Sequence, residues 1–304
     1  MQRGTRFMLR GAIDEAGLTR VAEAIERTAL PSILLHPSPA GEADFALGES
    51  KLGGRPDLPE GVPWPEFGGE PLAFVAQFDL AALAPFDTGK LLPASGILLF
   101  FIADPTPYFE GGVPGEGGIS RLLYFGATAL PLRPSEFPST LSLEGRYAPC
   151  KLSYSVQITL AIYDPYDPDF ERQYGFPLPL SRAEVRAYNA LGEKLHVEAG
   201  GTSQIMHRLL GHPDTIQGSM RGDLSTEPAD DAQTAEPADV RFWAVSLGPD
   251  FRPQVFRWQL LLQLDSDDMT GMRWGDTGRI YFWIRDQDLR QRNFDRMVLL
   301  DQSS

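Results

Sequence analysis

The chain has 304 residues, of which 42% are hydrophobic and 22% charged, a composition typical of a soluble globular protein that excludes overall disorder. The 27 Lys and Arg residues stand against 41 Asp and Glu residues, so the formal net charge is −14. This balance argues against binding to nucleic acid or to an anionic membrane surface, because both require basic patches.

In chain order, the first predicted element is an amphipathic helix in which Leu18, Val21, Ile25 and Ala29 recur at helical spacing. A second helix is predicted after Ser181 and Glu184, which form a capping box, and a short third one over 286–292. Most other apolar runs are short and rich in β-branched or aromatic residues. They predict strands over 33–36, 73–78, 96–102, 121–125, 153–162, 256–264, 278–284 and 297–300. The expected fold class is therefore α+β, rich in strands and with few helices.

Two stretches are typical of loops. Residues 104–118 combine glycine and proline without periodicity, and residues 218–239 form an acidic segment that predicts a flexible insertion. The longest wholly apolar stretch, 97–103, is far shorter than the roughly 20 residues that cross a bilayer. The N-terminus has no apolar region typical of a secretory signal, and the single cysteine, Cys150, allows no intrachain disulfide. We expect a cytoplasmic protein.

The most informative feature of the sequence is an internal repeat. Residues 51–57 match 208–214, residues 74–79 match 260–265, and residues 96–104 match 278–286, in the same order. Each half thus contains a turn with Pro-Asp, a strand with Gln and Asp, and an aromatic strand that follows a glycine. The alternative is that such turns and strands recur by chance in any β-rich protein.

We expect a single fused domain over 1–304, with pseudo-twofold symmetry from an internal duplication. The repeats would span about 31–150 and 195–304, joined by 151–194 and interrupted by the insertion at 218–239.

The sequence resembles the YwqG-like family of bacterial proteins of unknown function. The resemblance is carried by SKLGG at 50–54 with Pro56, LP at 58–59, WP at 64–65, AQFD at 76–79 and LP at 92–93 with 96–101, and most strongly by LLQLDSDD at 261–268 and WGDTGRIYFWI at 274–284. It implies a strand-rich α+β bacterial cytoplasmic protein, and it supplies no reaction and no catalytic residues.

The repeated glutamines, Gln77 and Gln263, lie among apolar strand residues, where an unsatisfied amide would cost about 1–3 kcal/mol. Each amide either bonds to neighbouring backbone at an equivalent place in the two halves, or both face a shared cleft. Asp79 and Asp265 follow two residues later, and Asp79 is placed to cap a short helical turn that begins at Leu80.

An acidic cluster follows the second glutamine and comprises Asp265, Asp267, Asp268 and Asp276, with Trp274 nearby. The order resembles a calcium loop, but Met269 occupies a ligand position and no glutamate closes the loop. A turn whose carboxylates accept backbone N–H groups is the simpler interpretation. The histidines offer no spacing typical of zinc. We therefore expect neither a metal nor another cofactor.

The candidate ligand-binding residues are Gln77, Asp79, Gln263, Asp265, Asp267, Asp268, Trp274 and Asp276. No motif for nucleophilic catalysis or phosphate binding is present, so the sequence predicts no catalytic residues and no oligomeric state. The favoured hypothesis is a non-enzymatic protein that binds a protein partner or a small molecule, and an immunity or antitoxin protein is one form of it. One alternative is a hydrolase or transferase that uses the acidic cluster in a cleft between the halves, and a purely structural or scaffold role is the third possibility.

Overall fold

The computed structural model describes residues 3–103, 119–127, 131–163, 180–202, 205–218, 220, 224 and 258–303. The helices are α1 (Arg3–Glu15), α2 (Ala22–Thr28), α3 (Leu80–Leu83), α6 (Arg182–Glu198) and α8 (Asp286–Gln291), with 3-10 turns η1 (Thr19–Val21), η2 (Glu42–Asp44) and η4 (Phe294–Arg296). The main sheet contains β1 (Leu30–Pro39), β2 (Lys51–Leu52), β6 (Ala73–Asp79), β7 (Ile97–Ile102), β8 (Ser120–Phe125), β10 (Cys150–Thr159), β11 (Arg208–Leu209), β12 (Trp258–Asp265), β13 (Arg279–Arg285) and β14 (Val298–Gln302). Two small ribbons pair β3 (Asp57–Pro59) with β9 (Leu132–Pro134), and β4 (Glu66–Phe67) with β5 (Glu70–Pro71).

The expectation of a strand-rich α+β chain is confirmed. The predicted loop at 104–118 lies outside the described residues, as does nearly all of the predicted insertion at 218–239. Among the helices that the structure describes, none has the length and apolar character needed to span a membrane.

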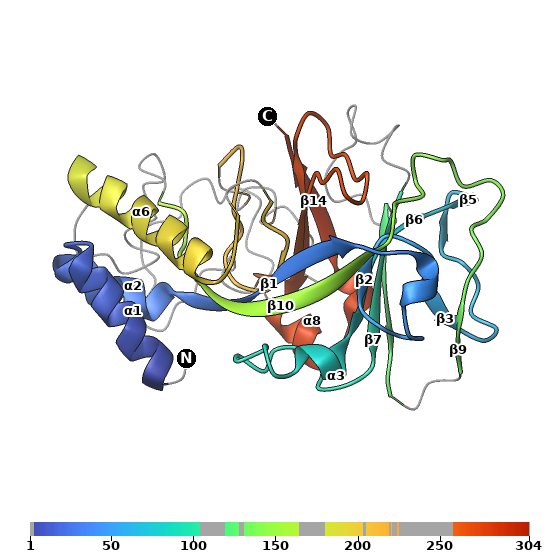
Figure 1. The fold of residues 1–304 in the computed structure, drawn as a ribbon, viewed down its shortest axis with the longest axis horizontal. Helices are drawn as coiled ribbons and strands as arrows, with labels where there is room; N and C mark the ends of the chain where they lie inside the picture. Colours follow the sequence, from blue (N-terminus) through green and yellow to red (C-terminus); the bar gives the residue numbers. More distant parts are fainter. Residues whose placement is uncertain are drawn as a thin grey trace, which may run out of the picture.

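The centre of the sheet is an antiparallel ribbon of the two long strands β1 and β10, which pair from Leu30 opposite Thr159 to Pro39 opposite Cys150. In Figure 1 this ribbon runs along the molecule in front of the other strands. The sheet order is β14-β13-β12-β11-β1-β10-β2-β6-β7-β8. The N-terminal strand β1 therefore belongs to the side of the sheet that holds the C-terminal strands.

The two sides of the sheet are built alike, position by position. Lys51 lies opposite Gln77 where β2 meets β6, and Arg208 lies opposite Gln263 where β11 meets β12. The register shifts once in each side, at Val75 within the β6–β7 pair and at the corresponding Leu261 within the β12–β13 pair. The segments matched in the sequence thus occupy corresponding places in the fold.

The sheet curls so that β7 and β13 face one another. Phe100 and Phe282, which correspond in the repeat, meet across the core with ring centroids 5.0 Å apart. Aliphatic and aromatic side chains from both sides of the sheet join in this one buried core.

A second core lies at one end of the molecule, where α1, α2 and α6 gather beside the end of the central ribbon (Figure 1). The capping box that predicts α6 is present, since Glu184 N–H donates to Ser181 Oγ and Ser181 N–H donates to a Glu184 carboxylate oxygen. The predicted first helix is split into η1 and α2. Helix α1 is not predicted, because its buried residues Leu9 and Ile13 stand beside the exposed apolar residues Phe7 and Met8, which blur the helical pattern.

Replacing Glu184 by glutamine is expected to lower the free energy of unfolding by about 1 kcal/mol at pH 7. Hydrogen bonds from Arg20, at 2.8 and 3.0 Å, and from Ser181 lower the pKa of Glu184 to about 2. A carboxyl group with a lowered pKa stabilises the fold above its unfolded pKa and loses that contribution as the pH falls through the folded pKa. Urea unfolding between pH 7 and pH 2 should therefore show the two proteins converging, and a constant difference would contradict the prediction.

Candidate functional site

The repeated glutamines occupy fully buried and equivalent positions on β6 and β12. Gln77 Oε1 accepts from Asp57 N–H at 2.8 Å, and Gln77 Nε2 donates to Glu49 O at 2.9 Å. In the other half, Gln263 Oε1 accepts from Asp214 N–H at 2.9 Å, and Gln263 Nε2 donates to Met206 O at 2.8 Å. Both amides thus bond to neighbouring backbone at matching places, which is the simpler of the two interpretations from the sequence.

The aspartates that follow the glutamines have different surroundings. Asp79 caps α3 by accepting from Ala81 N–H at 2.9 Å, as predicted. Asp265 is buried, accepts from Met206 N–H at 2.8 Å and has its Oδ1 atom 2.6 Å from Arg279 Nε. The difference arises in the next strand, because Ile97 lies opposite Asp79 on β7 whereas Arg279 lies opposite Asp265 on β13.

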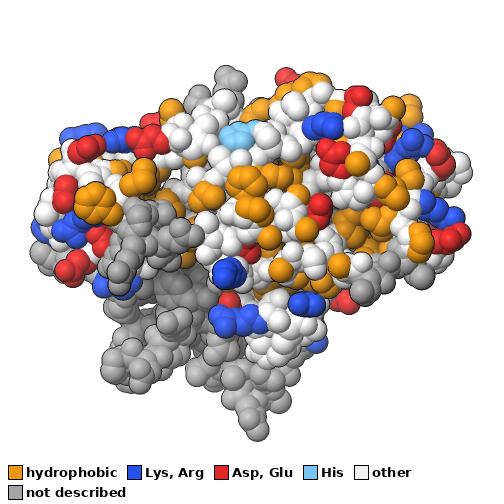
Figure 2. All heavy atoms as spheres, turned by 60° about the horizontal axis from the view of Figure 1, so that its bottom comes forward, with side chains coloured by type: hydrophobic (Ala, Val, Ile, Leu, Met, Phe, Trp, Pro, Cys, Tyr) orange, Lys and Arg blue, Asp and Glu red, His pale blue; other side chains and the backbone are white. Residues whose placement is uncertain are grey.

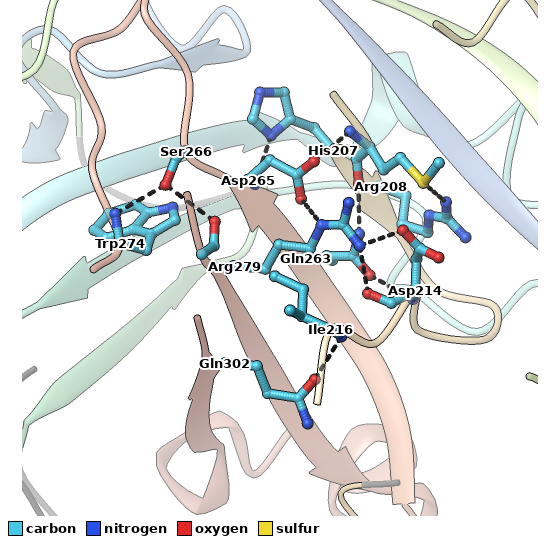
Figure 3. Close-up of polar contacts among 12 residues, drawn as sticks. His207, Arg208, Asp214, Ile216, Gln263, Asp265, Ser266, Trp274, Arg279 and Gln302 are labelled. Carbon is cyan, nitrogen blue, oxygen red and sulfur yellow. Dashed lines mark hydrogen bonds and ion pairs between the residues drawn. The ribbon is translucent and has the colours of Figure 1, made fainter. Parts of the chain in front are cut away.

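We call Arg208, Asp214, Asp265 and Arg279 the charged cluster (Figure 3). Arg279 Nη1 donates to the Asp214 backbone carbonyl at 2.8 Å and also contacts the Asp214 carboxylate. Arg208 is 4% exposed, and its Nη1 donates to His212 O at 3.2 Å. Neither arginine nor Asp214 is predicted from the sequence as a site residue, although the repeat aligns Arg208 with Lys51 and Asp214 with Asp57.

Burial controls the electrostatics of the charged cluster. It raises the pKa of Asp265 above the usual value despite the nearby Arg279, and it lowers the pKa of Arg208. For Arg279 burial alone would lower the pKa, but the carboxylates of Asp265 and Asp214 outweigh it and raise the pKa. Two guanidinium groups and two carboxylates are balanced in this way, which is the condition under which charges are tolerated in a protein interior.

Beside the charged cluster, His207 and Asp267 form a buried pair. His207 Nδ1 accepts from the backbone N–H of Asp265 at 3.1 Å, so its Nε2 carries the proton and faces Asp267 Oδ2 at 3.3 Å. Asp267 Oδ1 also accepts from Met269 N–H at 2.8 Å. Burial would raise the pKa of Asp267, but the hydrogen bonds from His207 and Met269 outweigh it and lower the pKa.

We call residues 266–277 the acidic turn. Asp267 fixes its base, and Trp274, 1% exposed, packs edge-on against Tyr147 with ring centroids 5.8 Å apart. Asp268 and Asp276 instead lie on the surface, where Asp268 pairs with Arg273 at 2.6 Å. The acidic turn therefore has a buried, hydrogen-bonded base and exposed carboxylates at its surface.

The structure divides the candidate residues from the sequence into three groups. Those in or beside the end of β12 lie buried, namely Gln263, Asp265, Asp267 and Trp274. Asp268 and Asp276 lie on the surface of the acidic turn, and Gln77 and Asp79 lie in the other half. Binding of a ligand by any of them stays a prediction.

The chemistry open to these residues is limited by their bonds within the chain. Within the described residues, no group of three or more His, Cys, Asp or Glu side chains is placed to hold a metal ion. Asp265 and Asp267, two of the four aspartates that a hydrolase or transferase would use, are buried and held by the chain's own groups.

The family model described as "Domain of unknown function (DUF1963)" matches residues 50–302. A comparison with curated proteins finds no match. The matched region begins after β1 and includes both glutamines and the whole charged cluster.

Proposed function

For a chain that belongs to the DUF1963 family, a family of unknown function, we propose a role as a non-enzymatic binding protein that engages a basic surface of a protein partner through the acidic turn. The observation that carries this proposal is the construction of that turn. Its inner side chains, Asp267 and Trp274, are buried and fixed, while Asp268 and Asp276 are exposed. A preordered surface loses less conformational entropy on binding, and opposite charge speeds encounter with a partner.

The net charge of −14 supports the choice of a basic partner. An immunity or antitoxin protein that covers a basic toxin is one form of this function, and we place it in the bacterial cytoplasm. We also propose the narrower YwqG-like membership within the unknown-function family, on the motifs at 261–268 and 274–284.

We further infer that the two sides of the sheet descend from one duplicated segment. Support comes from hydrogen bonds that the sequence alone does not reveal. Asp79 N–H donates to Ser50 Oγ at 2.8 Å, and Asp265 N–H donates to His207 Nδ1 at 3.1 Å, at matching positions. The backbone also matches, since Gly53 and Leu210 have φ angles of 60° and 62°. On this proposal, the side that contains β6 and β7 retained the ancestral hydrogen bonds alone, and the side that contains β12 and β13 gained the charged cluster in addition.

Site-specific photocrosslinking in the native bacterium tests the binding function. A photoreactive residue at position 268 or 276 should capture a defined protein, whereas the same residue at the exposed Glu193 on α6 should not. Charge reversal supplies the matched comparison: Asp268→Lys is expected to weaken capture at position 276 at least tenfold, and Glu193→Lys to leave it unchanged. Equal capture at all three positions, or capture insensitive to Asp268→Lys, would refute the proposal.

A further inference from the structure

A small pocket lies between the start of β1 and the loop that follows α3, a loop whose counterpart in the other half is the acidic turn. The pocket has room for about one water-sized group. Its walls are largely apolar and include Pro31, Ile33, Phe86, Leu91 and Leu210. Figure 2, which brings the bottom of Figure 1 forward, shows hydrophobic side chains gathered across the middle of that face.

One charged side chain, Asp87, lines this pocket. Asp87 is 6% exposed, and its Oδ2 atom accepts from Leu92 N–H at 2.7 Å. Its Oδ1 atom is fully buried and has no hydrogen-bond partner within the described part of the chain. A buried carboxylate oxygen without a donor is costly, so the pocket is suited to a group that brings a donor or a positive charge.

The corresponding place in the other half is filled by the chain itself. Ile33 on β1 corresponds to Cys150 on β10, since they lie opposite Leu209 and Leu52 respectively. There the acidic turn closes over the chain before β10, where Ala148 N–H donates to Thr270 O at 2.8 Å and Trp274 packs on Tyr147. In the loop after α3 the large aromatic residue, Phe86, instead contacts Tyr154, with ring centroids 5.4 Å apart.

We propose that this pocket binds a primary ammonium group carried on an aliphatic stem, with Asp87 Oδ1 as its acceptor. An ammonium group is compact and carries three donors, whereas a planar guanidinium exceeds the space of one water-sized group. The ammonium group alone fills this space, so the methylene groups of the stem would lie outside the pocket, along the apolar surface at its mouth. Outside the pocket, the 38% exposed Val156 continues the apolar surface, because it lies opposite Ile33 on the central ribbon.

The ammonium pocket is separate from the acidic turn proposed above as the partner surface, and either proposal can be refuted without affecting the other. The ammonium group could belong to a free alkylamine or to a lysine side chain of a polypeptide. These sources share the same chemistry at Asp87 and differ in the group at the far end of the stem, so the experiment includes a probe for each.

The test is a two-dimensional NMR titration of the full chain at pH 7 and constant ionic strength. The probes are butylammonium chloride, N-acetyl-lysine methylamide and, as the uncharged control, butanol. We expect both charged probes to shift the amide signals of 32–33 and 86–92, and butanol to shift them at least tenfold more weakly. Tighter binding of the lysine derivative would identify a polypeptide as the source, and tighter binding of butylammonium a free amine.

Three variants separate charge from shape. Asp87→Asn should weaken butylammonium binding at least tenfold. Gly89→Ala should do the same with the carboxylate intact, because its methyl group would lie 3.7 Å from Asp87 Oδ1 and only in ordinary contact with Leu91. Lys90→Gln removes an exposed cation of the same loop and should leave binding unchanged or tighter.

An absence of shifts in the wild-type chain would overturn the proposal, and so would equal shifts with butanol. If Asp87→Asn fails to fold, Gly89→Ala still decides, because unchanged binding in that variant would place the probe elsewhere.

Discussion

Replacing Arg279 by methionine is expected to lower the free energy of unfolding by about 3–5 kcal/mol, the range observed when one partner of a buried ion pair is removed. Arg279 is 16% exposed in its side chain and contacts the carboxylates of both Asp265 and Asp214. Methionine keeps much of the volume of the stem but leaves two carboxylates against the single guanidinium of Arg208, and Asp265 is 3% exposed. Urea unfolding followed by circular dichroism measures the loss.

The effect of Arg279→Met should depend on pH. Burial already raises the pKa of Asp265, and loss of the cation raises it further. A carboxyl group with a raised folded pKa destabilises the fold as the pH rises above its unfolded value, so the deficit should shrink as the pH falls from 7 toward about 4, the usual aspartate pKa. Asp265→Asn in the Arg279→Met background should recover part of the loss.

Arg290→Met is the matched control for this prediction. Arg290 pairs with Asp286 on α8 at 2.8 Å but is 73% exposed, so the change should stay within about 0.5 kcal/mol. A loss below about 1 kcal/mol for Arg279→Met, or equal losses for the two variants, would show that the charged cluster does not support the fold.

Replacing either repeated glutamine by leucine is expected to lower the free energy of unfolding by about 2–4 kcal/mol, with similar values at the two positions. Each substitution keeps a side chain of similar size but leaves a buried or part-buried backbone N–H and a part-buried carbonyl without the glutamine partner, at about 1–3 kcal/mol for each group. The groups are Asp57 N–H and Glu49 O for Gln77, and Asp214 N–H and Met206 O for Gln263. Urea unfolding of both variants measures the two losses.

The comparison between the two glutamines is as informative as the size of the effect. Gln77 Nε2 also donates to Asp57 Oδ2 at 2.7 Å, so Gln77→Leu should cost slightly more than Gln263→Leu. Gln291→Leu, at an exposed position at the end of α8, is the control and should change stability by less than about 0.5 kcal/mol. A stabilising effect at either buried position would contradict the structural role of the amides.

Most of the strands longer than three residues could be predicted, because each is an apolar run bounded by turns that contain glycine or proline. The two-residue strands β2 and β11 could not be predicted in this way, since Lys51 and Arg208 are charged residues that the pattern assigns to the surface. Both are buried because an aspartate six residues later, Asp57 or Asp214, folds back toward them. Only the repeat indicates that these basic residues have a shared role.

Candidate site residues could be predicted where they are adjacent in one segment of the sequence. They could not be predicted where the site is formed by segments that are distant in the sequence. The acidic residues after β12 are adjacent in the sequence, so Asp265 and Asp267 are predicted. Their partners His207 and Arg279 come from segments about 60 residues before and 14 residues after Asp265, joined by pairing across strands that no local pattern encodes. The pocket beside Asp87 likewise forms between β1 and the loop after α3, which are far apart in the chain.

Because β1 pairs with β11 on the C-terminal side of the sheet, its position determines the order in which the strands of the sheet can pair during synthesis. The ribosome releases β1 first, but its neighbour β11 follows only after about 170 further residues. The strands from β2 to β10 can assemble on β1 in the meantime, and the other edge of β1 then offers unpaired backbone groups to the surroundings. A nascent chain stalled before β11 would thus expose an unpaired strand edge that is prone to aggregation. A fragment that starts after β1 would lack the strand with which β11 and the C-terminal side of the sheet pair.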